Sequence, residues 1–300
     1  MSSIEDCPRP ALPFSVTVVC TYKCRMFLFF IDDAQQQKCA RQGIQELVAI
    51  GGIIVLASEA RSLHDDLDRV CAHYGFPEGE VFKWSPAKDH WMRDNLVGDW
   101  RTKFFSAVLE AAHQHGARAV VAMVEPNWGR AVAKTPPMDA MTLALERYDN
   151  FLAASDCSGV VMAAESGSAQ DEDRLLAECL TTLKLGTDFV RFRRIATNVV
   201  TMPFKHSRLL HVADVVASAS TALAAGNTEF SQPLVQHIKP MLLVNGAGCV
   251  GGVGMKMHPD YCFGNLYHWL WGDLVDAEFG KRTPLPQKGR PYESGPDVFQ

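Results

Sequence analysis

The stretch SRLLHVADVVASAS, residues 207–220, is almost wholly apolar and carries a single carboxylate, Asp214. Four of its polar residues recur at intervals of four, three and four: Ser207, His211, Asp214 and Ser218. On a 3.6-residue repeat these four form one narrow stripe on a helix that we expect over residues 207–224. An ionised carboxylate buried without a partner is costly, so it is normally paired, hydrogen-bonded or bound to a metal. Asp214 is therefore the best indicator of chemistry in the chain.

Working outward from this helix, apolar strands alternate with helices along the chain. We predict strands at 26–31, 47–57, 117–124 and 159–164, with one or two more in 189–203. Further helices are predicted at 59–74, 89–116, 137–155, 170–185, near 232–244 and near 261–273. The alternation favours an α/β fold. We expect one domain over 26–275, a loosely ordered leader at 1–25 and a flexible tail at 276–300. Met26 precedes the first strand, so a translation start there is an alternative to a translated leader.

Composition narrows the class of protein. The formal net charge is −5, which argues against a molecule that is basic throughout, but a local basic groove remains compatible with it. No apolar run reaches the length of a transmembrane helix, so no membrane partner is expected. The nine cysteines are odd in number and scattered over the chain, which predicts reduced thiols in a cytoplasmic protein.

Three predicted strands are followed directly by an acid: Asp32, Glu125 and Glu165. Sites in open α/β sheets gather beyond the carboxyl ends of strands. If these acids meet Asp214, they form an oxygen-rich pocket that suits Mg²⁺ or Mn²⁺. Two such ions would clamp the attacking and leaving oxygens of a phosphodiester. The alternative is that each acid caps a turn or pairs with a nearby lysine.

Basic residues adjoin the Asp214 helix. Residues 189–213 contain no acid and five cations, which are Arg191, Arg193, Arg194, Lys205 and Arg208. Arg191 and Arg193 would share one face of a strand and could hold phosphates. Lys83 and Ser85, in VFKWSP at 81–86, could also contact phosphate or substrate. An ordinary solvated surface is the alternative for each of these groups.

The combination of motifs resembles the family called domain of unknown function 3800, in the ribonuclease H-like superfamily. FIDDA at 30–34 stands where that family opens with a strand leading into Asp-Glu-Ser-Gly, and FKWS at 82–85 is similar to its lysine-centred segment. AES at 164–166 looks like a reduced form of its mid-chain acidic pair. The segment from Ser207 to Ala217 is similar to its closing helix, and it is the most specific element of the resemblance, which spans about 26–226.

The resemblance implies a ribonuclease H-like mixed sheet flanked by helices, with a C-terminal helical extension, and a metal-dependent nuclease-type centre. Asp32, Glu165 and Asp214 would be catalytic and would bind Mg²⁺ or Mn²⁺ together with Asp33. The candidate substrate-binding residues are Lys83, Ser85, Arg191, Arg193, Lys205, Ser207, Arg208 and His211. The chain departs from the family pattern at four positions: Asp33 replaces glutamate, Ala34 serine and His211 glutamine, and Ala164 stands where an acid is common.

The leading hypothesis is hydrolysis of a nucleic-acid phosphodiester by metal-activated water, with Glu125 as a substitute for Glu165. Family context suggests mobile-element or antiphage-defence roles. The alternative is a catalytically silent module that binds nucleic acid or a protein partner, favoured by the missing acid at 164. A weaker option is a phosphohydrolase acting on nucleotides. The choice between DNA and RNA, and any protein activator, stays open at this point.

Overall fold

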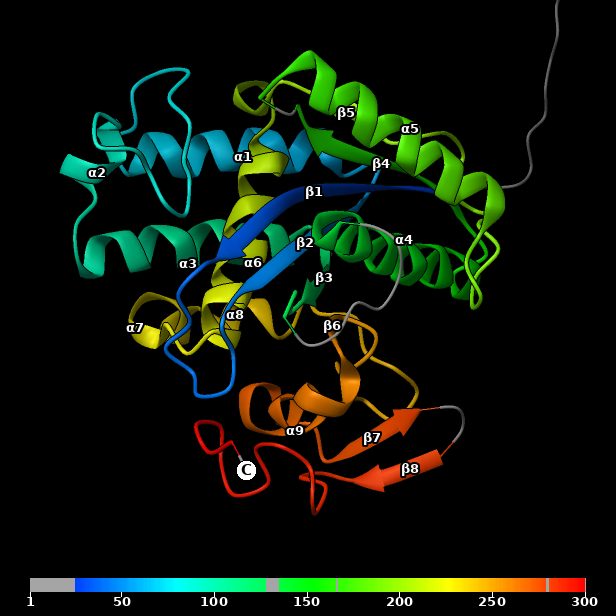
Figure 1. Ribbon diagram of the computed structural model, residues 1–300. Helices are drawn as coiled ribbons and strands as arrows, with labels where there is room; N and C mark the ends of the chain where they lie inside the picture. Colours follow the sequence, from blue (N-terminus) through cyan, green and yellow to red (C-terminus); the bar gives the residue numbers. More distant parts are fainter. Residues whose placement is uncertain (1–24, 128–134, 166, 279–280, 300) are drawn as a thin grey trace, which may run out of the picture.

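A six-stranded mixed sheet forms the centre of the computed structural model, which describes residues 25–127, 135–165, 167–278 and 281–299 (Figure 1). The strand order is β5-β4-β1-β2-β3-β6. The strands are β1 (Met26–Gln36), β2 (Leu47–Leu56), β3 (Arg118–Val124), β4 (Ser158–Ala164), β5 (Val200–Met202) and β6 (Met255–His258). β2 runs antiparallel to β1 and β3, while β4 is parallel to β1 and β5, and β6 is parallel to β3.

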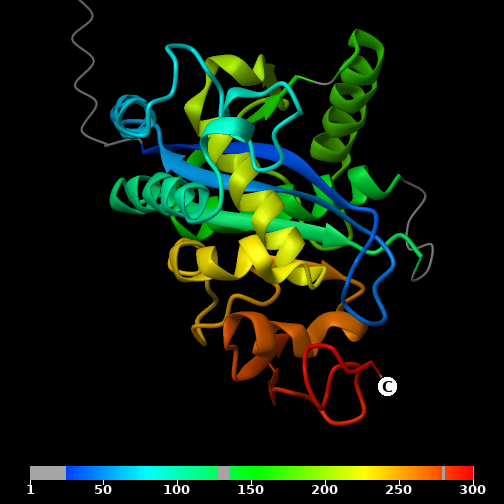
Figure 2. The same cartoon turned by 90° about the vertical axis from the view of Figure 1, so that its left-hand side faces the viewer.

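Helices cover both faces of the sheet, as Figures 1 and 2 show. One face carries α1 (Ala60–His73), α3 (Asp99–Gln114) and α6 (Arg208–Ala224), and the other carries α4 (Pro136–Ala154) and α5 (Ala169–Leu185). The shorter helices are α2 (Trp91–Asn95), α7 (Thr228–Ser231), α8 (Val235–Ile238) and α9 (Asp260–Trp271), with 3-10 turns η1 (Phe204–His206) and η2 (Gln232–Leu234). The predicted mixed α/β architecture, a sheet flanked by helices, is confirmed.

Alternation along β1 decides which residues face α6. Phe29 and Ile31 pack into the core under α4, whereas Phe30 and Ala34 pack into the core under α6. Successive side chains of a strand point to opposite faces, so Asp32 shares the α6 face with Phe30 and Ala34. The central strand therefore presents its carboxylate to the helix that carries the second one.

A glycine lets α6 approach the sheet closely. A Cβ atom added at Gly52 on β2 would lie 2.7 Å from the Cβ of Ala213, well inside van der Waals contact. Ala213 directly precedes Asp214, so this close packing sets the height of the acidic turn above the sheet. Gly52 thus serves helix–sheet packing.

Several elements differ from their predicted form. β1 runs five residues beyond the predicted end because its antiparallel pairing with β2 continues to Gln36, so Asp32 and Asp33 lie inside the strand. Within 189–203, where one or two strands were predicted, one forms, β5. Residues 232–244 form short turns rather than one helix, and β6 follows the glycine-rich loop where no strand was predicted. Short elements such as β5 and β6 depend on tertiary pairing and leave a weak local pattern.

The C-terminal segment is packed, contrary to the expected flexible tail. After the hairpin of β7 (Val275–Glu278) and β8 (Lys281–Pro284), Tyr292 is fully buried and its hydroxyl donates to the Gln42 carbonyl over 2.6 Å. Buried Arg41 forms an ion pair with Asp297 over 2.8 Å. The predicted leader lies outside the described residues except for Arg25. In the described part of the chain, no helix combines the length and apolarity needed to cross a membrane.

Candidate functional site

Asp214 lies on the second turn of α6 and is 9% exposed. Its Oδ2 accepts a 2.7 Å hydrogen bond from the backbone N–H of Trp84, and its Oδ1 accepts a 3.1 Å bond from the Ser218 hydroxyl. Ser218 follows one turn later on the polar stripe that the sequence predicted. The backbone bond from Trp84 was not predictable, because it joins two segments 130 residues apart. Burial raises the pKa of Asp214, and these two bonds oppose the rise.

Asp32 belongs to the same electrostatic group. Burial, together with the nearby carboxylates of Asp214 and Asp33, raises its pKa to about 8. The backbone N–H of Asp33 donates to Asp32 Oδ1 over 3.0 Å, while the Asp33 side chain itself is exposed. The structure thus brings Asp32 and Asp214 together from β1 and α6, with Asp33 at the margin.

Lys83 supplies the cation of this group. Its charge lowers the pKa of both Asp32 and Asp214, and its Nζ lies 4.4 Å from the centroid of the Phe204 ring. The side chain is exposed, so it reaches the pair from solvent. The lysine predicted to contact phosphate therefore stands beside the two carboxylates.

Glu165 is not shown to join the pair. It is exposed and follows the end of β4, where its N–H donates to the Met202 carbonyl over 3.1 Å. The parallel register pairs Ile31 with Ala163, so the next residues along, Asp32 and Ala164, lie side by side. Ala164 packs against the α6 core, on the face of Asp32. Among the residues that the structure describes, no group of three or more His, Cys, Asp or Glu side chains is arranged to hold a metal.

Glu125, the predicted substitute, is a structural residue and not part of the acid pair. It is 1% exposed, and its Oε2 accepts bonds from the backbone N–H groups of Gln45 and Glu46, at 3.1 and 3.3 Å. Its Oε1 accepts from the backbone and side-chain nitrogens of Asn127, both at 3.1 Å. The carboxylate thus holds the β1–β2 loop against the end of β3, which corrects the expectation that it meets Asp214.

The predicted arginine face does not form. Residues 189–199 are not a strand, and Arg191 donates to the carbonyls of Leu185 and Thr187 at 3.0 and 2.8 Å, beside the end of α5. The carbonyl of Arg194 accepts from the Gly159 N–H at the start of β4, so the exposed Arg193 lies at that end of the sheet. Ala164, the neighbour of Asp32, is five residues further along β4, which corresponds to about 16 Å. Arg193 is therefore at the opposite end of the sheet from Asp32.

The residues around the start of α6 have local partners. Ser207 caps the helix by accepting from the Leu210 N–H. Buried Arg208 donates to Asp68 Oδ1 over 2.7 Å and to the Glu80 carbonyl over 2.6 Å. Lys205 is exposed on η1. These contacts give Ser207 and Arg208 structural roles, in contrast to the predicted substrate contacts.

His211 is a core histidine. Its ring lies between Phe82 and Phe204, with centroid separations of 4.8 and 4.5 Å. Nε2 lies 3.0 Å from the Phe204 carbonyl, which can only accept, so Nε2 carries the proton. Burial and the neighbouring Arg208 charge lower the His211 pKa to about 3, which keeps the ring neutral.

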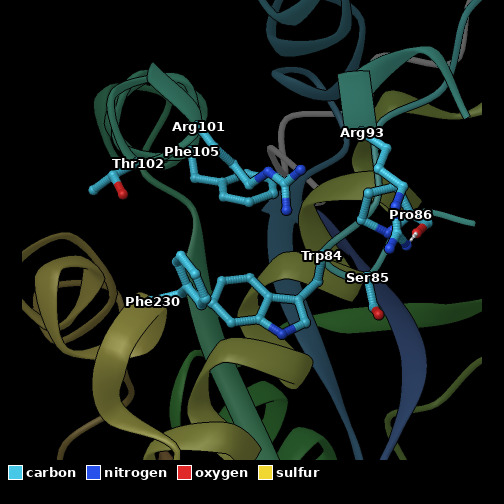
Figure 3. Close-up of a pocket in the computed structure, with 8 residues that line it drawn as sticks. All are labelled: Trp84, Ser85, Pro86, Arg93, Arg101, Thr102, Phe105 and Phe230. Atoms are coloured by element: carbon cyan, nitrogen blue, oxygen red, sulfur yellow. Dashed lines mark hydrogen bonds between the residues drawn. The ribbon is translucent and has the colours of Figure 1, made fainter. Parts of the chain in front are cut away.

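Trp84 lines a cavity of about 380 Å³ (Figure 3), and the backbone N–H of the same residue donates to Asp214 of the acid pair. Its lining residues are Trp84, Ser85, Pro86, Arg93, Arg101, Thr102, Phe105 and Phe230. The sequence pattern indicated Ser85, which lines the cavity, and its neighbour Lys83. It did not indicate Arg93, Arg101 or Phe230. No local pattern could have found them, because they come from α2, α3 and α7 and meet only in the folded chain.

Comparison with family models, with curated proteins and with solved structures found no match to this chain.

Proposed function

We propose that this protein hydrolyses phosphodiester bonds of nucleic acid with the help of a divalent metal ion, and that its sheet is ribonuclease H-like. One observation carries the proposal: Asp32 on the central strand and Asp214 on the apolar helix above it occupy one electrostatic group with Lys83. Burial raises the pKa of both carboxyl groups, and the charge of Asp214 adds to the rise at Asp32, so the pair forms a site that a cation would stabilise.

The donor set fits one Mg²⁺ or Mn²⁺ ion. Mg²⁺ is commonly held by one or two carboxylates, with waters and substrate phosphate completing its shell. Each carboxylate has about four lone-pair positions. Asp214 uses two of them, for Trp84 and Ser218, and Asp32 uses one, for the Asp33 N–H. Both residues therefore keep oxygen lone pairs for an ion, whereas an additional ligand such as Glu165 would have to come from an exposed position.

The residues of the chain would divide the work as follows. A bound divalent ion lowers the pKa of a water ligand and offsets the charge that develops on the phosphate. Asp32 and Asp214 would hold it, and the Trp84 and Ser218 hydrogen bonds fix the Asp214 carboxylate in one orientation. Lys83, exposed next to the pair, would neutralise a phosphate oxygen of the substrate.

Among the described residues, the thiols of Cys39, Cys71, Cys157, Cys249 and Cys262 are free. Free thiols are typical of a reducing compartment, and we propose the cytoplasm.

The test is cleavage of labelled single-stranded, duplex and hybrid substrates with Mg²⁺, Mn²⁺ or EDTA. Asp32→Asn and Asp214→Asn should each abolish cleavage, as should EDTA. Asp156→Asn is the matched control, because the side chain of Asp156 is 90% exposed and pairs with Arg194 at the other end of the sheet. Full activity in Asp214→Asn or in EDTA would refute the proposal.

A second candidate is a ribonuclease H-like module that binds nucleic acid or a protein partner without catalysis. The observation that favours it is Ala164, which stands beside Asp32 at the position where the resemblance would place an acid. It predicts no cleavage by folded protein under any metal condition, together with salt-sensitive binding in EDTA.

A further inference from the structure

An aromatic cavity with two arginines adjoins the proposed centre. From its geometry, and resting on the proposed function, we infer that it is a subsite for an unpaired nucleobase and the phosphate next to it, which makes single-stranded nucleic acid the substrate class. Its volume of about 380 Å³ lies in the range of small-ligand pockets.

The cavity offers a stacking platform. The rings of Trp84 and Phe105 are stacked, with centroids 5.6 Å apart and an interplanar angle of 29°. Phe230 lies beside the Trp84 indole and is 47% exposed, so its ring is accessible to a ligand (Figure 3). Proteins that bind single strands stack bases on such rings, and the contact tolerates any base because every base has a flat face.

Two cations border the platform. Figure 3 shows Arg101 extending toward Trp84, while Arg93 lies beside Pro86, whose carbonyl accepts from Arg93 Nη1 over 3.5 Å. Arg101 is fixed by a 2.9 Å bond from its Nε to the Leu96 carbonyl, and within the described ranges neither arginine forms an ion pair with an acid. Burial and the charge of Arg93 lower the pKa of Arg101, so the two guanidinium groups are close enough to repel each other. Such a pair suits an anion, and guanidinium matches the geometry of phosphate.

Trp84 connects this cavity to the acid pair. Its ring lines the cavity, while its backbone N–H donates to Asp214 over 2.7 Å. A base stacked on this ring would hold the strand next to Asp214 and Lys83. In a duplex the faces of a base are covered by its neighbours, and extruding it costs stacking and pairing energy. The cavity therefore favours a single strand over a duplex.

The test is fluorescence anisotropy of a labelled oligonucleotide, single-stranded or duplex, in EDTA so that no cleavage occurs. Wild type should bind the single strand at least about tenfold more tightly than the duplex. Phe230→Ala should weaken single-strand binding by about tenfold. Arg93→Gln should weaken it and lower the slope of log affinity against log salt by about one.

Matched controls use the exposed residues Phe189 and Arg193, which lie outside the cavity. Phe189→Ala and Arg193→Gln should bind like wild type. Equal losses in the controls, equal affinity for single strand and duplex, or preferential binding of an acidic peptide would each overturn the inference. Because this binding assay excludes metal, its result is independent of the cleavage test. Cavity-dependent binding here, together with no cleavage in the cleavage test with Mg²⁺ or Mn²⁺, would refute only the proposed hydrolysis. Asp214-dependent cleavage that is unchanged in Phe230→Ala and Arg93→Gln would refute only the subsite.

Discussion

At the scale of single residues, the side chains of the polar stripe on α6 have three different roles. Ser207 caps the helix, His211 is a neutral core residue, and Asp214 with its partner Ser218 faces Asp32. The periodicity of the sequence predicted the stripe but could not separate these roles. They depend on what each side chain meets across the fold, such as the Phe82 ring at His211 and the Trp84 N–H at Asp214.

Asp32→Asn should stabilise the metal-free fold above neutral pH. The Asp32 pKa rises from 3.8 in the unfolded chain to about 8 in the folded one, so between these values the folded state binds the extra proton and stability falls as pH rises. Asparagine removes this loss. The melting temperature in EDTA should exceed that of wild type by a few degrees at pH 8.5 and by less at pH 5, since 1 kcal/mol corresponds to roughly 2–4 °C.

Differential scanning calorimetry at both pH values measures this effect. Asp156→Asn serves as the control, because its exposed carboxylate has no comparable burial to relieve. A lower melting temperature for Asp32→Asn at pH 8.5 would contradict the account of Asp32 as a destabilised buried acid.

At the scale of elements, the long strands and helices followed from sequence because their patterns are local. β2, α1, α4, α5 and α6 begin and end within a residue or two of their predicted bounds. The end of β1 was missed because four of the five residues from Asp32 to Gln36 are polar, and pairing with β2 rather than hydrophobicity keeps them extended. For the same reason the predicted acid set was too large: the register, which the sequence does not encode locally, places Ala164 and not Glu165 on the face of Asp32.

Ala164→Asp should add a third carboxylate to the pair. The new side chain would stand beside Asp32 on the face that packs under α6. The added negative charge there should make the metal-free protein less stable. Mn²⁺ should bind about tenfold more tightly, because the affinity for a divalent ion depends on the number of charged ligands. Calorimetric titration with Mn²⁺ measures the change. Glu165→Gln is the comparison, and it should leave affinity near the wild-type value. If Mn²⁺ affinity falls more in Glu165→Gln than it rises in Ala164→Asp, the result would contradict this interpretation of the register.

At the scale of the whole molecule, the C-terminal segment contributes to the fold away from the acid pair. Tyr292 fills a fully buried position and bonds to Gln42, and Trp269 donates to the Tyr292 carbonyl over 2.8 Å. The proline, glycine and charge content of this segment suggested a loose tail, but one buried tyrosine and the Arg41 ion pair hold it. Composition describes the average of a segment and misses such single anchors.

Tyr292→Ala should therefore lower the free energy of unfolding by about 3–5 kcal/mol, as expected for a large buried aromatic side chain. Urea denaturation measures it, with the 57% exposed Tyr261→Ala as the control. Folded Tyr292→Ala should keep its metal-dependent activity. An unchanged urea midpoint would show that the segment does not support the core.

The central claim is that Asp32 and Asp214 together hold one divalent ion. Isothermal titration with Mn²⁺ at pH 7.5, on wild type, Asp32→Asn, Asp214→Asn and Asp156→Asn, tests it most directly. We predict one ion bound per chain in wild type and in Asp156→Asn, and affinity at least about tenfold weaker in the other two variants. Equal affinity in all four proteins, or no binding by folded wild type, would contradict the account.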